Sequence, residues 1–358
     1  MAHELQNRFS GLVLEKLKKE LVLKDGIVFN NDYEGDPKAG VVKVPVRNAD
    51  VEARSYDKVN GISAESSSTS YESIYINNDK AVNEIIDGYD SVAVPDGIVA
   101  ERLNSATYAL QRALDNDGAS ELVAGGTKQF LAAVTPSNIY ETVVDTRKVM
   151  SKANIPNDGR RYLLVTPECY SLMLKDTVNF IRQSDLSQKM VEEGAIGKYA
   201  GFVLYEWNDS TVGLLYIAGH PKYASRVKEW QVPVYLSDLK DSDKYVGACA
   251  VKGRMVYAHK VLNKDAVMAV FSPEQLTLNA SSAGVGKTVV AVTASGLGTL
   301  KYRKAPAERA VFGQSTTAGF STFSSGSTQI NAASGEVIEI VEVDASGNVK
   351  RAGYCLAI

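Results

Sequence analysis

One long amphipathic stretch, PDGIVAERLNSATYALQRALDNDG at residues 95–118, constrains the fold of this chain most. Its main apolar residues recur at spacings of four, seven and four, which places them on one stripe of a helix. They are Val99, Leu103, Leu110 and Leu114. The polar run Asn116-Asp117-Gly118 tolerates left-handed backbone and predicts the end of the helix. A helix of about twenty residues spans about 30 Å, so we expect it to lie along a sheet.

The charge balance and the cysteines exclude several classes of protein. Among 358 residues, 39 Lys and Arg face 42 Asp and Glu, a net charge of −3 that excludes a strongly basic nucleic-acid coat. The three cysteines, Cys169, Cys249 and Cys355, are widely spaced, which predicts neither a disulfide framework nor a zinc knuckle. The sequence also lacks a signal-type apolar core and a membrane-length apolar run. We therefore expect a soluble protein of a reducing compartment that has no membrane partner.

The region before the long helix predicts an arm and an extended hairpin. Residues 4–22 are typical of a short amphipathic helix within an N-terminal arm. GVVKVPV at 40–46 and YESIYIN at 71–77 predict two strands, and Pro45 marks the first as an edge. The polar, serine-rich segment between these strands is too long for an ordinary connection. It is either a disordered insertion or an arm that becomes ordered against another molecule.

The middle of the chain predicts helices on a sheet. Asn138 and Glu141 have the spacing of a reciprocal cap at the start of a helix. The clearest unit is RRYLLVTPECYSLMLKD, in which a buried strand is followed by Thr166 as N-cap and by Pro167 at the first helical position. Further strands follow up to residue 272. From residue 277 the composition turns to Gly, Ser and Thr with short strands, which predicts a separate small all-β domain at 277–358.

The sequence predicts no catalytic, cofactor-binding or metal-binding residues. SSAGVGKT at 281–288 ends like a phosphate-binding loop, but the strand-like VVAVTAS follows where a helix is required, so we interpret it as a β-turn. The three histidines, His3, His220 and His259, do not have the spacing of metal ligands. We therefore expect a protein that is not an enzyme and has no cofactor.

The order of these elements resembles the major capsid protein of tailed bacteriophages, the Hong-Kong-ninety-seven-type fold. The stretches that carry the resemblance are RRYLLVTPECYSLMLKD, AIGKYAGFVLYEWN, LYIAGHPKYA and VNEIIDGYDSVAVPDGIVAERLNSATYAL. The resemblance implies an α+β fold, with these parts in chain order: an N-terminal arm (1–39), an extended hairpin loop (40–77), a peripheral domain (78–129) that includes the spine helix at 95–118, an axial domain (130–248), and return strands of the peripheral domain (249–276). The β domain at 277–358 is an addition that the family does not explain.

The resemblance implies a structural subunit that self-assembles, as pentamers and hexamers, into the icosahedral shell around double-stranded DNA. Implied partners are portal and scaffolding proteins, a possible decoration protein, and the packaged DNA through weak contacts that do not depend on sequence. The resemblance also implies that the protein is located in the virion capsid, after synthesis and assembly in the host cytoplasm. Within the extended loop and its strands we expect subunit contacts from Arg54, Tyr56, Asp57, Lys58, Tyr71 and Tyr75.

Two other functions remain open at this point. An encapsulin-like shell that encloses an enzyme in a cell has the same fold. The β domain at 277–358 is also compatible with an adhesin or a carbohydrate-binding module.

Overall fold

The computed structural model describes residues 21–35, 40–47, 53–63, 69–88, 98–176, 181–182, 196–208, 211–239, 244, 246–293 and 298–358. The predicted helix at 4–22 lies outside these residues except for its last two positions. The chain divides into two compact units, Met1–Glu121 with Pro221–Leu262, and Leu122–His220 with Asn263–Ile358.

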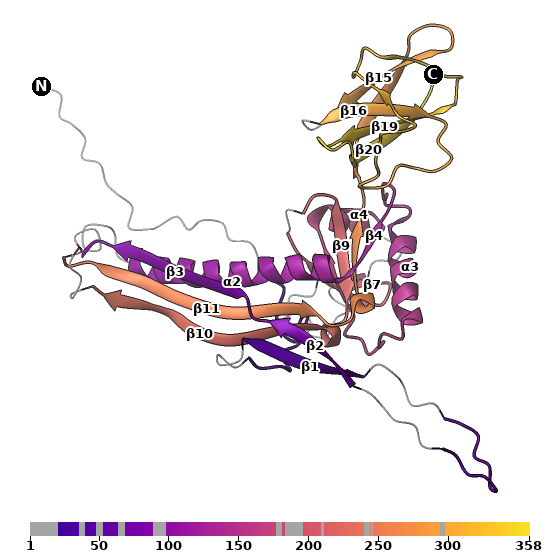
Figure 1. Ribbon diagram of the computed structural model, residues 1–358. Helices are drawn as coiled ribbons and strands as arrows, with labels where there is room; N and C mark the ends of the chain where they lie inside the picture. Colours follow the sequence, from indigo (N-terminus) through magenta and orange to yellow (C-terminus); the bar gives the residue numbers. More distant parts are fainter. Residues whose placement is uncertain are drawn as a thin grey trace, which may run out of the picture. The chain divides into compact units, whose positions relative to one another are not determined.

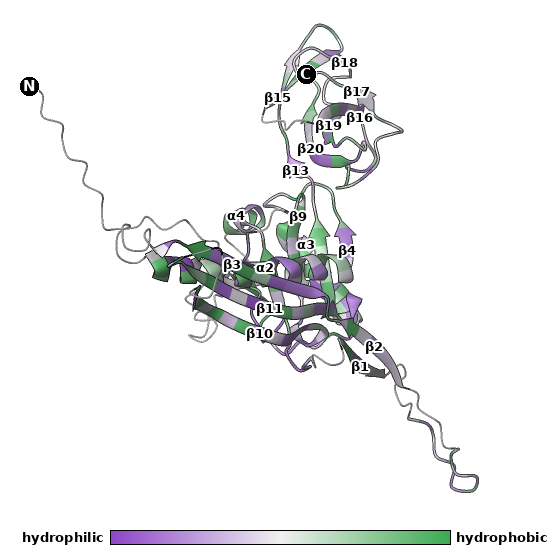
Figure 2. Ribbon diagram, turned by 60° about the vertical axis from the view of Figure 1, so that its left-hand side comes forward, coloured by the Kyte–Doolittle hydropathy of each residue, from purple (hydrophilic) through white to green (hydrophobic). Residues whose placement is uncertain are grey.

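In the first unit, a long helix packs on a sheet of three described antiparallel strands, as the apolar stripe predicts. The helix is α2 (Ile98–Gly125), and the strands are β3 (Asn78–Ile86), β10 (Ala224–Asp238) and β11 (Cys249–Val261), in the order β10-β11-β3. All three strands lie beside α2 in Figure 1. The hydropathy colours alternate along β10 and β11 in Figure 2, the pattern of strands with one face buried. The predicted stripe, with Leu110 and Leu114 at its buried end, packs against Met255 and Tyr257 of β11.

The predicted end of this helix at Gly118 is wrong, because α2 continues to Gly125. Asp117 accepts a hydrogen bond from the Tyr257 hydroxyl at 2.8 Å and pairs with Lys80 at 3.4 Å. Gly118 is buried, and a Cβ there would lie 3.0 Å from the ring of Phe29. These residues therefore serve side-chain packing in the middle of the helix and do not terminate it.

A short N-terminal segment is fixed beside α2 by buried side chains and by an ion-pair cluster. Val22, Leu23, Val28 and Phe29 are all buried. Asn30 exchanges backbone hydrogen bonds with Ala224 and Arg226, each at 2.8 Å. Arg226 is almost completely buried, donates to Asp25 at 2.9 Å and to His259 at 2.9 Å, and lies over the Phe29 ring.

The pKa values in this cluster follow from burial and from the two cations. Burial raises the pKa of Asp25, but hydrogen bonds and charges of Lys228 and Arg226 outweigh it and hold the pKa below its ordinary value. Burial, and then the charge of Arg226, lower the pKa of His259 to about 3. His259 is therefore neutral at pH 7 and accepts the hydrogen bond of Arg226.

The second unit contains a mixed sheet of seven described strands, with two helices. Its strands are β4 (Thr127–Phe130), β5 (Tyr162–Val165), β6 (Ile181–Arg182), β7 (Gly197–Tyr199), β8 (Phe202–Glu206), β9 (Leu214–Gly219) and β12 (Val267–Phe271), in the order β4-β12-β9-β5-β8-β7-β6. The central strands β5, β9 and β12 are buried along their whole length. A strand that is covered on both faces needs such a continuous apolar run.

The helices of this unit are α3 (Ile139–Lys152) and α4 (Pro167–Lys175). The cap predicted for α4 is confirmed, because Thr166 accepts from the Cys169 amide and Pro167 begins the helix. The reciprocal cap predicted for α3 is wrong. The Asn138 side chain makes no cap hydrogen bond and instead accepts from the amide of Thr135 at 2.7 Å.

The C-terminal part is all-β, as predicted, but it belongs to the second compact unit and does not form a separate unit. Its described strands form two sheets. One contains β13 (Glu274–Gln275), β16 (Thr299–Lys304), β17 (Ser321–Thr322), β19 (Val337–Val343) and β20 (Val349–Leu356); the other contains β14 (Thr277–Ser282), β15 (Lys287–Thr293) and β18 (Gln329–Asn331). Their facing sides enclose a core that includes Leu276, Val290, Ile330 and Ile340. Because Leu276 belongs to this core and β13 pairs with β20, the β region includes residues before the expected start at 277.

The strand pairing differs from the expected boundaries in two further places. Residues 224–238, expected within the axial domain at 130–248, form β10 beside β11 in the first unit. Residues 267–271, expected among the return strands at 249–276, form β12, which pairs with β4 and β9 in the second unit. The apolar pattern predicts that these segments are strands, but it does not identify their partners.

Candidate subunit-contact surface

The base of the extended hairpin presents two tyrosines on its outer face. β1 (Val41–Arg47) and β2 (Thr69–Tyr75) pair antiparallel, with Val41 opposite Tyr75 and Pro45 opposite Tyr71. The inner face is buried, because Val44 and Ile74 pack against β10 and β11. Tyr71 and Tyr75 lie three positions and one position from Ile74, so both side chains point to the opposite face, where they are 64% and 66% exposed.

The described part of the loop contains a tight turn with exposed apolar side chains. The carboxylate of Asp57 accepts from the Val59 amide at 2.9 Å and from the Asn60 side chain at 2.6 Å. The Gly61 amide donates to the carbonyl of Asp57 at 2.8 Å and closes the turn. These donors, the Val59 amide first, hold the pKa of Asp57 below its ordinary value. Three side chains of this segment are exposed: Tyr56 (69%), Val59 (89%) and Ile62 (50%).

The six predicted contact residues therefore form two groups. Tyr71 and Tyr75 share one face of β2, whereas Arg54, Tyr56, Asp57 and Lys58 lie in or next to the turn and are exposed. The prediction omitted Val59 and Ile62, although both are visible as isolated apolar residues in a polar stretch.

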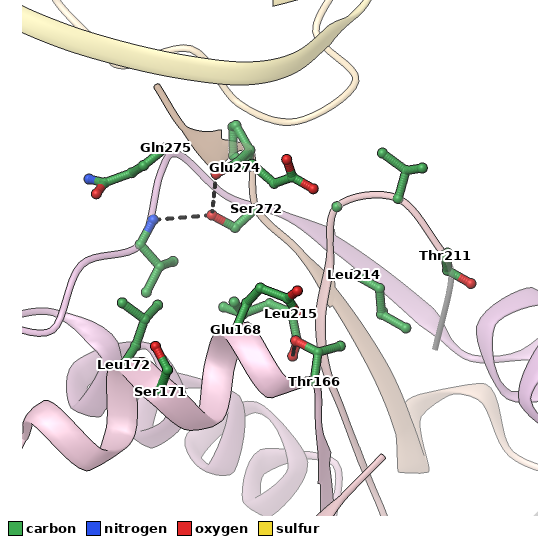
Figure 3. A pocket seen from close by; sticks show the side chains of 14 residues that line it. Thr166, Glu168, Ser171, Leu172, Thr211, Leu214, Leu215, Ser272, Glu274 and Gln275 are labelled. Carbon is green, nitrogen blue, oxygen red and sulfur yellow. Dashed lines mark hydrogen bonds between the residues drawn. The ribbon is translucent and has the colours of Figure 1, made fainter. Parts of the chain in front are cut away.

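A cavity of about 350 Å³ lies in the second unit, where β12 leads into β13. Its lining mixes polar side chains, such as Glu168 and Gln275, with apolar ones, such as Leu172 and Leu214 (Figure 3). Ser272 accepts from the Val134 amide and donates to the carbonyl of Ala132, and Thr166 donates to the carbonyl of Leu215. These two hydroxyls therefore form hydrogen bonds with the backbone that stabilise the fold. Within the described residues, no group of three or more His, Cys, Asp or Glu side chains is arranged to hold a metal ion.

Two further features of the sequence have structural explanations. The glycine-rich turn at 281–288 joins β14 to β15 as a hairpin, with Lys287 donating to the carbonyl of Gly284, so the interpretation as a β-turn is confirmed. Cys169 is fully buried, and burial raises the pKa of its thiol, which makes it a poor nucleophile.

None of the described helices has the length and hydropathy needed to cross a membrane.

Comparisons with known proteins connect this geometry to one fold. No family model and no curated protein matches the chain. Among solved structures, the chain is similar to one from Mycobacterium phage Che8, with 22% identity, a TM-score of 0.60, and coverage of 74% of this chain and 96% of that one.

Two other similar structures are described as capsids. The capsid structure of cyanophage P-SCSP1u shares 15% identity at a TM-score of 0.59, over 75% of this chain and 92% of that one. The mature capsid of bacteriophage PhiM1 shares 13% at a TM-score of 0.53, over 73% and 92%. Nearly the whole of each of these chains is matched, whereas about a quarter of this one has no counterpart. The chain therefore has the capsid-protein fold of tailed bacteriophages that its sequence resembles.

Proposed function

We propose that this chain is the major capsid protein of a tailed bacteriophage, a structural and non-enzymatic subunit that self-assembles into the virion shell. The observation that carries the proposal is the match to over nine-tenths of capsid chains that share at most 22% of its residues. The other two candidate functions have no such support, since none of the comparisons favours an encapsulin-like compartment or an adhesin.

The extended loop supplies the subunit contacts in this proposal. Tyr71 and Tyr75 would pack against a neighbouring subunit, because tyrosine contributes a large contact area at little cost in conformational entropy. Val59 and Ile62 would extend this contact at the turn. Arg54, Asp57 and Lys58 are candidates for ion pairs between subunits, with the Asp57 carboxylate also engaged within its own turn.

The other partners follow from the shell function. Portal and scaffolding proteins would act during assembly in the host cytoplasm. Contact with packaged double-stranded DNA would be weak and independent of sequence, because a chain with a net charge of −3 offers no dense basic stripe that would release many counterions. A measured preference for one short DNA sequence at physiological salt would contradict this part of the proposal.

The C-terminal β region would form a projection on the shell exterior that contacts neighbouring subunits or a decoration protein. The β region makes up about a quarter of the chain. A similar share of the chain has no counterpart in the capsid structures. A deletion that tests this role should begin after Pro273, because β13 and Leu276 belong to the β region. We expect shells that assemble but resist heat less well than full-length shells. Unchanged heat resistance would show a passive appendage.

Expression of the full chain, alone and with its genomic neighbours, followed by electron microscopy, tests the shell function directly. We expect closed icosahedral particles, and only small oligomers under every condition would contradict the proposal. Particles that enclose a host enzyme instead of DNA would favour the encapsulin-like alternative.

A substitution in the turn then tests the contact surface. Val59→Asp should block assembly and leave the subunit folded, because the side chain is almost completely exposed in the subunit. Val285→Asp is the matched control, since Val285 is also a fully exposed valine in a glycine-flanked turn. Equal assembly of both variants would remove the turn from the contact surface.

A further inference from the structure

We propose that Asn60 is a site of spontaneous deamidation, and that the product opens the turn at 57–61. Asn60 and Gly61 form the one Asn-Gly pair in the sequence. Asn60 is exposed, and Gly61 has a positive φ of 68° with open space where a Cβ would be. A glycine in this position leaves its backbone nitrogen open to approach by the preceding side chain.

The reaction needs only water as a co-reactant. The backbone nitrogen of Gly61 attacks the side-chain carbonyl carbon of Asn60 and forms a new carbon–nitrogen bond. The bond to Nδ2 breaks, and Nδ2 leaves as ammonia with the proton that the Gly61 amide gives up. Water then opens the cyclic imide at one of its two carbonyls and leaves aspartate or isoaspartate at this position.

The turn itself restrains this reaction through Asp57. The Gly61 N–H, which must lose its proton, donates to the carbonyl of Asp57 at 2.8 Å. The departing Asn60 amide donates to the Asp57 carboxylate at 2.6 Å. Both groups are therefore held in hydrogen bonds while the turn is closed, and the reaction proceeds from the fraction of molecules in which the turn is open.

The product cannot restore the closed turn. A carboxylate at position 60 replaces a donor with an acceptor, and it would face the Asp57 carboxylate at hydrogen-bond distance. Two like charges so close together disfavour the ionised pair, and the hydrogen bond from Asn60 is lost. Isoaspartate also adds one carbon to the backbone of the turn. In either case, Tyr56, Val59 and Ile62 lose their fixed arrangement.

The effect on assembly rests on the proposed function, because these three side chains belong to the proposed contact surface. A subunit that ages before assembly would lose the geometry of its turn. Subunits already in a shell would react more slowly, because a covered turn opens less often.

Peptide mapping of the full chain by mass spectrometry, after incubation in warm and mildly alkaline buffer, tests the modification. Enzymatic methylation of isoaspartate identifies the product. We expect Asn60 to convert faster than Asn348, which lies in a similar Asp-capped turn but precedes Val349. Asn60→Gln should abolish the signal from this peptide. Conversion of Asn60 no faster than that of Asn348 would overturn the proposal.

A second variant tests the restraint. Asp57→Ala should accelerate the conversion about fivefold, the factor that corresponds to loss of one hydrogen bond of ordinary strength. An unchanged or slower conversion would refute the role of Asp57.

Assembly of fresh and aged protein then separates the proposed shell function from the proposed deamidation. If fresh protein forms no shells, the proposed function fails, while the peptide map still decides the modification.

Discussion

The ring of Phe29 lies against Gly118 in the middle of helix α2, and this contact leaves no room for a larger residue. A Cβ at Gly118 would be 3.0 Å from the ring and 3.1 Å from Nε2 of His259. The N-terminal segment, the helix and strand β11 meet at this glycine.

Gly118→Ala should therefore destabilise the protein, although the same change normally stabilises a helix by about 1 kcal/mol. The added methyl group overpacks the contact with Phe29 and His259, at a cost of about 1–3 kcal/mol. Thermal unfolding measures the effect. Asn104→Ala, at an exposed position of the same helix, is the control and should be neutral or slightly stabilising. Higher stability of the Gly118 variant would show that Phe29 is not fixed against the helix.

The stability of the protein should fall as the pH decreases from about 6.5, the ordinary pKa of histidine. Burial and the charge of Arg226 lower the folded-state pKa of His259 to about 3. The unfolded chain therefore binds the proton first, and stability falls by up to about 1.4 kcal/mol for each pH unit between these two values. The groups around this ring are Phe29, Tyr257, Arg226, Asp25 and Lys228.

The variant His259→Gln keeps a hydrogen-bond acceptor for Arg226 and removes this titration. Its unfolding free energy should depend less on pH between about 4.5 and 6.5 than that of the unmodified protein. This window lies between the folded-state pKa of His259, about 3, and the ordinary histidine pKa of about 6.5. Some dependence should remain, because burial also lowers the pKa of His220. An identical pH profile for both proteins would exclude His259 as the source.

Phe312→Ala should loosen the attachment of the β region to the seven-stranded sheet of the second unit. The Phe312 ring stacks on Phe271 at 5.6 Å, its amide donates to the carbonyl of Leu131, and a Cβ at Gly213 would overlap it. Removing a buried phenylalanine costs about 3–5 kcal/mol. Hydrogen exchange should increase at residues 309–314 and 131–134, while β19 and β20 stay protected. Val285→Ala should leave all of these segments unchanged.

Arg303→Met should destabilise the β region because it leaves a buried carboxylate without its cation. Glu339 is 2% exposed and accepts from Arg303 at 2.6 Å and from the Ala310 amide at 2.9 Å. Breaking a buried pair on one side costs about 3–5 kcal/mol. The double variant with Glu339→Gln should recover part of this loss, and a double-mutant cycle of chemical unfolding measures the coupling. Strictly additive effects would contradict a direct pair.

The sequence alone determined the features that depend on neighbouring residues. The cap of α4 by Thr166, the β-turn at 281–288, and the apolar stripe of the long helix all match the structure. Each is controlled by groups a few positions apart, so the local pattern contains the necessary information. The exposed Tyr71 and Tyr75 follow in the same way from the alternation of a strand with one buried face.

Only the tertiary structure decided the features that depend on distant residues. α2 continues past Gly118, and the glycine there leaves room for Phe29 and His259, which are remote in sequence. The side chain of Asn138 turns to Thr135 instead of capping α3. The strand at 267–271 pairs with β4 and β9 although its apolar run is compatible with either sheet. Such choices are made by packing and by hydrogen bonds between segments that meet only when the chain is folded, and local propensity does not encode them.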